Sequence, residues 1–525
     1  MNETLFLRST IKLNKKFVLG VLVIITLFYL YLTTKIALNP YSYKSVLFIG
    51  FVFLIFFYFI PYKLFYFMLF VVPIFYFLGE ILPDKIARVY ELCTIVLPIT
   101  SAVLICIKNR KLIYKWMLQC LFIFFIYVFI FLISGFVNNS EVYKIIQSFQ
   151  FELRYFLIFL VFSIMRIKKE RIIKILKILF VVLNIYLMSG YFYLILGRFL
   201  NFYGSFFINE VAIRGYLFGS LNFPFGRFFT PQGGHNMAGM FLVIGFLVFY
   251  ILWKTDRENF YRITKLKSIR VWKWLMIIGI LLTESKISFL CMVVGMWLTN
   301  YFIPRKKSKM FTIATIFVFL FLIIFLIMAL IEIEPAKLPG FLKLMYVHSY
   351  IDFIQRGHDR PATYYFFFKI LTQDLKTFLV GLGPGNFGLA LVAYGVDVQK
   401  SIFLFEELKR KVGYNYLPGI GTLLDSNVVS LGGQIGFLGL ILFFFIFLPI
   451  WVRAKKSYEV FKDSFTNFVC LVVIVIIPIF LLSGFTNTFW TVKPNALWFW
   501  TLCGISMAQI NNIVFKIKNE NSFDK

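Results

Sequence analysis

The chain has 525 residues, of which 60% are hydrophobic, 21% aromatic and only 15% charged. Its mean hydropathy is +0.84 and its formal charge is +30, from 54 Lys and Arg against 24 Asp and Glu. Soluble domains are about 25% charged and about 45–50% apolar, so this composition excludes a disordered chain, a coiled coil and an ordinary soluble enzyme. We expect an all-α, polytopic integral membrane protein.

Apolar stretches that could cross a bilayer recur along the whole chain. Because a spanning helix needs about 20 mostly apolar residues, we predict about 12–14 transmembrane helices. They are expected near residues 17–34, 45–60, 64–82, 91–107, 117–137, 153–167, 172–197, 237–254, 271–284, 286–303, 311–332, 428–450, 466–486 and 494–511. The stretches 45–60, 153–167 and 271–284 are short and are the ones most readily merged with a neighbour.

Lys and Arg gather in alternate connections between these predicted helices. The clusters precede the first span, follow the last, and occupy residues 108–115, 166–171, 257–270, 305–309 and 453–456. Basic residues concentrate in cytoplasmic loops, so their position predicts that both termini are cytoplasmic. The net charge is therefore interpreted as a topology signal, and we expect no nucleic-acid partner.

Two outward connections are long, near residues 198–236 and 333–427. The second has too few apolar runs for the membrane, and short amphipathic helices are expected at 362–380 and 401–412. This pattern divides the chain into residues 1–332, with transmembrane helices 1–11, a large extracytoplasmic loop at 333–427, and C-terminal helices with a cytoplasmic tail at 428–525. The six cysteines fall within predicted spans without metal-ligand spacing, so neither a metal site nor a cofactor is expected.

Ionisable residues near the outward surface are the candidates for chemistry, because charges at membrane depth are costly and often functional. Arg227 stands in a Pro- and Gly-rich turn before a span, Lys286 ends a tight turn beside Glu284, and Asp425 stands at the mouth of a span. Simpler alternatives exist for each of them. Arg227 could snorkel to lipid head groups, Lys286 could pair with Glu284, and Asp425 could cap the helix that follows it rather than act as a general base.

The outer loops hold further candidates. Arg214, His235, Arg356, His358, Arg360 and Asn427 could bind an anionic or glycan substrate. Arg suits this purpose because its guanidinium binds phosphate oxygens in a bidentate manner. The run Gly381-Leu-Gly-Pro-Gly385 lacks the Gly-Lys-Ser/Thr of a nucleotide-binding loop, and we interpret it as a turn that lets the backbone approach a substrate.

These segments together resemble the O-antigen ligase and polymerase superfamily. Four pieces match in order: Arg227-x3-Pro-x3-His-Asn-x-Ala238, Leu282-Thr-Glu-Ser-Lys286, Arg360 with Gly381-Leu-Gly-Pro-Gly-Asn-Phe387, and Asp425-Ser426-x9-Gly436-x-x-Gly439. The resemblance covers roughly residues 210–500. Lys286 stands where the family has Arg, which keeps the charge but loses bidentate binding. Asp425 stands where the family's ligases have His, and this substitution favours a polymerase over a ligase.

The resemblance implies a GT-C-like, metal-independent glycosyltransferase in the bacterial cytoplasmic membrane. Its donor would be a glycan on undecaprenyl diphosphate and its acceptor a sugar hydroxyl of a second lipid-linked repeat unit. Arg227, Lys286 and Arg360 would stabilise the departing diphosphate, with Arg214 and Arg356 in reserve. Asp425 would be the base, with His358 and His235 as alternatives. A chain-length regulator protein is a further expected partner. The alternatives are an O-antigen ligase and, from a different class, a polysaccharide flippase or other transporter.

Overall fold

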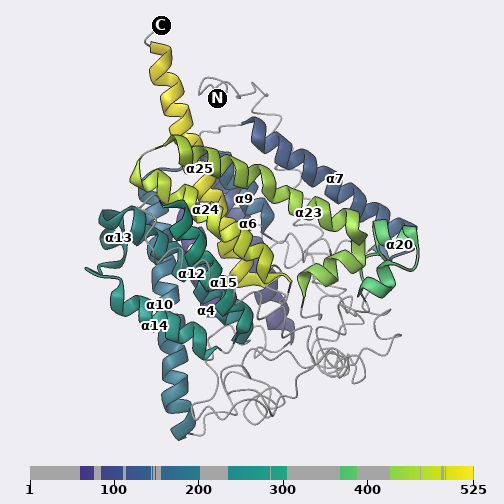
Figure 1. The fold of residues 1–525 in the computed structure, drawn as a ribbon, viewed down its shortest axis with the longest axis horizontal. Coiled ribbons are helices and arrows are strands. Elements are labelled where there is room, and N and C mark those ends of the chain that lie inside the picture. The colour runs from purple at the N-terminus through teal and green to yellow at the C-terminus, as the bar shows by residue number, and fades with distance from the viewer. Residues whose placement is uncertain are drawn as a thin grey trace.

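The computed structural model describes residues 60–75, 84–109, 114–142, 155–200, 235–283, 285–303, 367–386, 426–461, 463–485 and 492–523, with residues 145, 148 and 490. Every element in these ranges is a helix, as Figure 1 shows. The predicted spans at 17–34, 45–60 (except residue 60) and 311–332, and the predicted helix at 401–412, lie outside the described residues.

The helices follow the predicted apolar stretches closely. They are α4 (Pro61–Ile74), α6 (Asp84–Lys108), α7 (Lys115–Val137), α9 (Phe156–Ser163), α10 (Lys169–Leu200), α12 (His235–Thr255), α13 (Arg257–Thr264), α14 (Arg270–Leu282), α15 (Lys286–Phe302), α20 (Leu375–Val380), α23 (Asn427–Val460), α24 (Ser464–Ser483) and α25 (Lys493–Phe523). Several begin at a side-chain cap: Asp256, Ser285, Asp374, Ser426 and Asp463 each accept a backbone hydrogen bond three residues on. Such caps satisfy amide groups that the first helical turn leaves unpaired.

Five helical stretches in the described part of the chain are long and apolar enough to cross a membrane. They are Lys115–Val137, Lys169–Tyr191, Met237–Thr255, Asn427–Val460 and Ser464–Ser483, and shorter apolar helices cover Pro61–Ile74, Cys93–Ile107 and Ile287–Phe302. The chain is thus a multi-pass membrane protein, and the all-α prediction is confirmed. The predicted span at 153–167 contains only an eight-residue helix, α9, with fully buried side chains.

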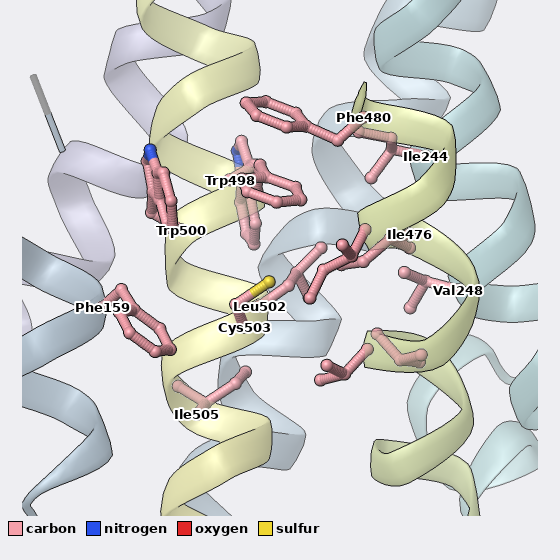
Figure 2. Close-up of a cluster of buried hydrophobic side chains, with 14 of the residues drawn as sticks. Phe159, Ile244, Val248, Ile476, Phe480, Trp498, Trp500, Leu502, Cys503 and Ile505 are labelled. Carbon is pink, nitrogen blue, oxygen red and sulfur yellow. The ribbon is translucent and has the colours of Figure 1, made fainter. Parts of the chain in front are cut away.

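The core lies where α24 and α25 pack against α9 and α12. Figure 2 shows Ile476 and Phe480 of α24 facing Trp498 and Leu502 of α25, with Phe159 of α9 on the far side. These side chains are at most 2% exposed. Apolar burial of this kind excludes lipid as well as water from the centre, and close packing rather than water exclusion holds such helices together.

α7 lies at the edge of the bundle. Five of its exposed apolar side chains form one stripe: Phe122, Phe125, Phe129, Leu132 and Phe136. The spacing of three or four residues places them on a single helix face. Exposed Phe on a helix of this hydrophobicity is expected to face lipid.

The connections that carry basic clusters and that the structure describes meet at one end of the bundle, which we call the basic end. Asn512 of α25 donates to the carbonyl of Ile167 at 2.7 Å, and Ser464 donates to Asp256 at 3.2 Å. Arg262 of α13 forms an ion pair with Glu170 of α10 at 2.6 Å. The sequence pattern that placed these loops on one side is therefore matched by their position in the structure, and their cytoplasmic location stays a prediction.

Two further predicted elements differ from the observed ones. A single amphipathic helix was expected at 362–380, but residues 372–374 are not helical. The side chain of Asp374 accepts a hydrogen bond from the amide of Thr377 and starts a new helix, α20, so the preceding helix does not continue through it. The span expected at 428–450 runs on to Val460, and Gly436 interrupts it with φ 69° and ψ −174°. α23 therefore consists of two helical segments of unequal length, 427–435 and 437–460, which we call its first and second halves.

Candidate functional site

The segments that resemble family motifs gather at the end of the bundle opposite the basic end. We call it the motif end and define it by 134–140, 235–239, 283–288, 381–386, 426–436 and 484–495. The contacts of the described residues build it in two pairs of segments, which the ends of α24 and α25 join.

The first pair is the start of α12 and the tight turn between α14 and α15. A methyl group on Gly239 would lie 2.6 Å from Ser288 Oγ and 2.8 Å from Thr283 Oγ1, so the two segments are in direct contact. Ser285 caps α15 by accepting from the amide of Ser288 at 3.3 Å. The structure thus brings the block that ends at Ala238 next to the Leu282–Lys286 turn.

The second pair is the glycine run and the first half of α23. The amides of Leu382 and Gly383 donate to the carbonyls of Gly433 and Gln434 at 3.0 Å and 2.9 Å. Those carbonyls end the first half of α23 and would otherwise lack helical partners. Figure 1 shows α20, which leads into the glycine run, beside the bend of α23 and the end of α7. In the described residues, Gly381 packs against the backbone of α23, and Gly383 packs against the side chains of Asn138 and Ser140.

Polar side chains at the end of α7 complete this second pair. Ser134 Oγ lies within hydrogen-bond distance of the carbonyls of Val380 and Gln434. Asn138 donates to the carbonyl of Gly381 at 3.1 Å, and Asn386 donates to Ser140 at 3.2 Å. Three segments therefore share one hydrogen-bond network, although the end of α7 is more than 200 residues away in the sequence from the other two.

The N-terminus of α23, at Ser426 and Asn427, which we call the mouth of the helix, is also held by buried hydrogen bonds. Ser426 is the N-cap residue, with its hydroxyl accepting from the amide of Val429 at 3.2 Å and donating to the carbonyl of Gly484 at 3.1 Å. Asn427 accepts from the amide of Trp490 at 3.0 Å. Because Ser426 holds the cap position, the alternative in which Asp425 is merely the cap of this helix is wrong.

Two contacts join the pairs through the ends of α24 and α25. Asn495 of α25 donates to the carbonyl of Met237 in α12 at 3.3 Å. Cys291 of α15 contacts the carbonyl of Ile479 in α24 at 3.9 Å. The carbonyl of Gly484, just past α24, in turn holds the start of α23.

Most of the predicted site residues are not among those that the structure describes. Arg214, Arg227, Arg356, His358, Arg360 and Asp425 lie outside the described residues, and the described backbone of His235 and Lys286 begins α12 and α15 without a description of their side chains. The exception is Asn427, which was predicted to bind substrate and is 2% exposed. Its side-chain oxygen accepts a hydrogen bond from the backbone amide of Trp490, which indicates that Asn427 stabilises the structure of the motif end.

Sequence reasoning missed two features of the motif end. One is the set of polar residues Ser134, Asn138 and Ser140. The only indication of it in the sequence is that an otherwise apolar helix ends in polar residues. The other is Lys493, a cation that is only 6% exposed at the start of α25. The Lys493-Pro494 pair in front of a span could have indicated it, since Pro favours the first helical turn.

Asp374, the residue that caps α20, is an ionisable side chain of the large loop that the structure describes. The amide and hydroxyl of Thr377 hold the pKa of Asp374 below its usual value, because both donate to its carboxylate, at 2.7 Å each. Within the described ranges, no group of three His, Cys, Asp or Glu residues comes together that could hold a metal ion.

Comparison with known proteins adds no relative. No protein-family model matches this sequence, and no curated protein matches it. The function is therefore argued from the motif end itself.

Proposed function

We propose that this protein is a polysaccharide polymerase, a GT-C-like glycosyltransferase that extends an O-antigen, capsule or exopolysaccharide. It would transfer a glycan from undecaprenyl diphosphate to a sugar hydroxyl of another lipid-linked repeat unit. The reaction would take place at the outer face of the bacterial cytoplasmic membrane, with both termini in the cytoplasm and the large loop outside.

The observation that carries the proposal is the convergence of four motif segments at one end of a membrane bundle. The sequence resemblance required that residues 227–238, 282–286, 381–387 and 425–439 form one site, although they are spread over more than 200 residues. The described parts of all four lie at the motif end, paired by the contacts of Gly239 with Ser288 and of Gly383 with Gln434. Such contacts are what a single site built from these segments would require.

The chemistry needs a base and fixed cations. Asp425 would take the proton of the acceptor hydroxyl as that oxygen bonds to the anomeric carbon of the donor, and the bond from this carbon to the diphosphate oxygen breaks. Arg227, Lys286 and Arg360 would stabilise the negative charge that develops on the departing diphosphate. Lys493 adds a buried cation at the same end. Arg214, Arg356, His358 and His235 would contact the diphosphate or the glycan.

The lipid part of the substrate also fits this arrangement. The exposed face of α7 runs to Phe136 and Val137, which are 64% and 47% exposed, and Asn138, which donates to the glycine run, follows directly. A polyprenyl chain could therefore lie along an apolar face while its diphosphate reaches the motif end.

The test is a polymer assay with purified protein and lipid-linked repeat units. Arg227→Ala and Arg360→Ala should abolish the ladder of products while the variants still insert into membranes. Arg262→Ala is the matched control, because Arg262 is an exposed cation at the basic end and should leave the ladder unchanged. Products of normal length from both site variants would refute the assignment.

The same assay separates the two alternatives. A ligase would add one preformed glycan to a lipid A-core or other acceptor and yield a single product. A flippase is favoured by one specific observation, the break in α23 at Gly436, because broken helices are common where transporters bind substrate. Movement of a lipid-linked glycan across proteoliposomes, without formation of a longer glycan, would establish the flippase in place of the polymerase.

A further inference from the structure

The break in α23 depends on an unusually close approach of two glycines. A methyl group on Gly436 would lie 2.5 Å from the carbonyl carbon and oxygen of Leu379 and 2.6 Å from the amide nitrogen of Gly381. A methyl group on Gly381 would lie 2.5 Å from the amide nitrogen of Gly436. Both residues have positive φ, 69° and 72°. The obstacle in each direction is backbone, so no side-chain rotation could make room.

The first half of α23 is anchored at both of its ends. At the break, the loop amides of Leu382 and Gly383 take its last carbonyls. At the mouth, Ser426 and Asn427 are bonded to the segment that follows α24. Nine residues of helix, about 14 Å at 1.5 Å per residue, connect the two anchors.

Burial makes this half of the helix a rigid connection. Each residue from Asn427 to Gly436 is buried, whereas Phe437, immediately after the break, is 44% exposed. Phe437 in turn stacks on Phe378 of α20, with ring centroids 5.2 Å apart. The segment formed by α20 and Gly381 therefore packs against α23 at the break through both backbone and side-chain contacts.

We propose that Gly381 and Gly436 are positioning residues, whose contact sets the place of the α23 mouth and so of Asp425, the residue just before its cap. This inference rests on the proposed function, since it assigns the glycine run a role in holding the base and not in binding the substrate. A shift of the first half of α23 would displace its mouth, and a displacement of about 1 Å can cost as much as 100-fold in rate.

The first measurement is hydrogen exchange of the full-length protein in detergent, read over residues 380–386. Gly381→Ala and Gly436→Ala should each remove the protection of the Leu382 and Gly383 amides. The matched control is Gly245→Ala in α12, where the three atoms nearest to the added methyl all belong to the side chain of Leu183, the closest at 2.3 Å. The control should keep this protection. Equal protection in Gly436→Ala and the unmodified protein would overturn the contact.

The second measurement is turnover with lipid-linked repeat units. Each site variant should lower kcat at least about tenfold with little change in the KM for the donor, because the base is displaced while the donor's cation contacts remain. The double variant should be little worse than either single one, since both remove the same contact. Lost protection with unchanged kcat would overturn the positioning role.

The outcomes also separate this inference from the proposed function. If the unmodified protein forms no polymer, the proposed function and the positioning role both fail. The exchange result would still decide whether the two glycines hold the break in α23.

Discussion

Replacing Asn427 by Ala should destabilise the mouth of α23. In the structure, the side-chain oxygen of Asn427 accepts a hydrogen bond from the amide of Trp490 at 3.0 Å, and both residues are at most 2% exposed. Ala would leave this buried amide without its partner, which costs about 1–3 kcal/mol. Water cannot readily replace the lost acceptor, because the ring of Trp490 packs between Phe443 and Phe480.

The assay can use the protein's own thiols. Cys291, Cys470 and Cys503 are buried, so a thiol-reactive dye reports unfolding in detergent on heating. Asn427→Ala should lower the midpoint by several degrees and reduce polymer formation. The control is Asn512→Ala, which removes a 2.7 Å bond to Ile167 at the basic end and should lower stability without changing the polymer made per folded molecule.

An unchanged midpoint in Asn427→Ala would refute this reasoning. If polymer formation fell while the midpoint stayed constant, Asn427 would act on the substrate, as the sequence alone predicted. The two results together therefore distinguish a residue that holds the site from one that binds within it.

Three further predictions concern helix caps and a surface ion pair. Ser426→Ala should cost about 0.5–2 kcal/mol, the usual loss of an N-cap, and Ser426→Asp should recover part of it in the same dye assay. Because hydrogen bonds lower the folded-state pKa of Asp374, its contribution to α20 should be fully present above the unfolded value near 3.8 and lost as pH falls through the folded pKa. Exchange protection of the Thr377 amide should show this dependence, and Asp374→Asn should abolish it. Glu170→Gln should change stability by at most about 1 kcal/mol, because its partner Arg262 is 48% exposed; a larger loss that high salt does not reduce would contradict this.

The sequence predicted helices well where apolar residues run without interruption. The stretches expected at 117–137, 237–254 and 466–486 correspond to α7, α12 and α24 within a few residues. The tight turn before Lys286 was also expected and is only three residues long. In each case the cause is local, because apolar length and capping side chains act within a few residues of the chain.

The candidate site was less accessible to prediction. Asp425 was expected as either base or cap, and the structure gives the cap to Ser426, one position later. The glycine run was expected to approach a substrate, yet the amides of Leu382 and Gly383 are bonded to the carbonyls of Gly433 and Gln434. Hydrogen-bonding capacity can be read from a residue type, whereas the identity of the partner depends on which segments the bundle brings together.

By itself, the sequence determined that this chain spans a membrane many times, where most of its described helices lie, and which connections share the basic end. Apolar length and charge are sums over neighbouring residues, so they need no knowledge of the fold. Only the tertiary structure decided that α23 is broken at Gly436 and that Gly381 closes the break. Those two residues are 55 positions apart, and the contact exists because neither has a Cβ atom to keep two backbones from meeting.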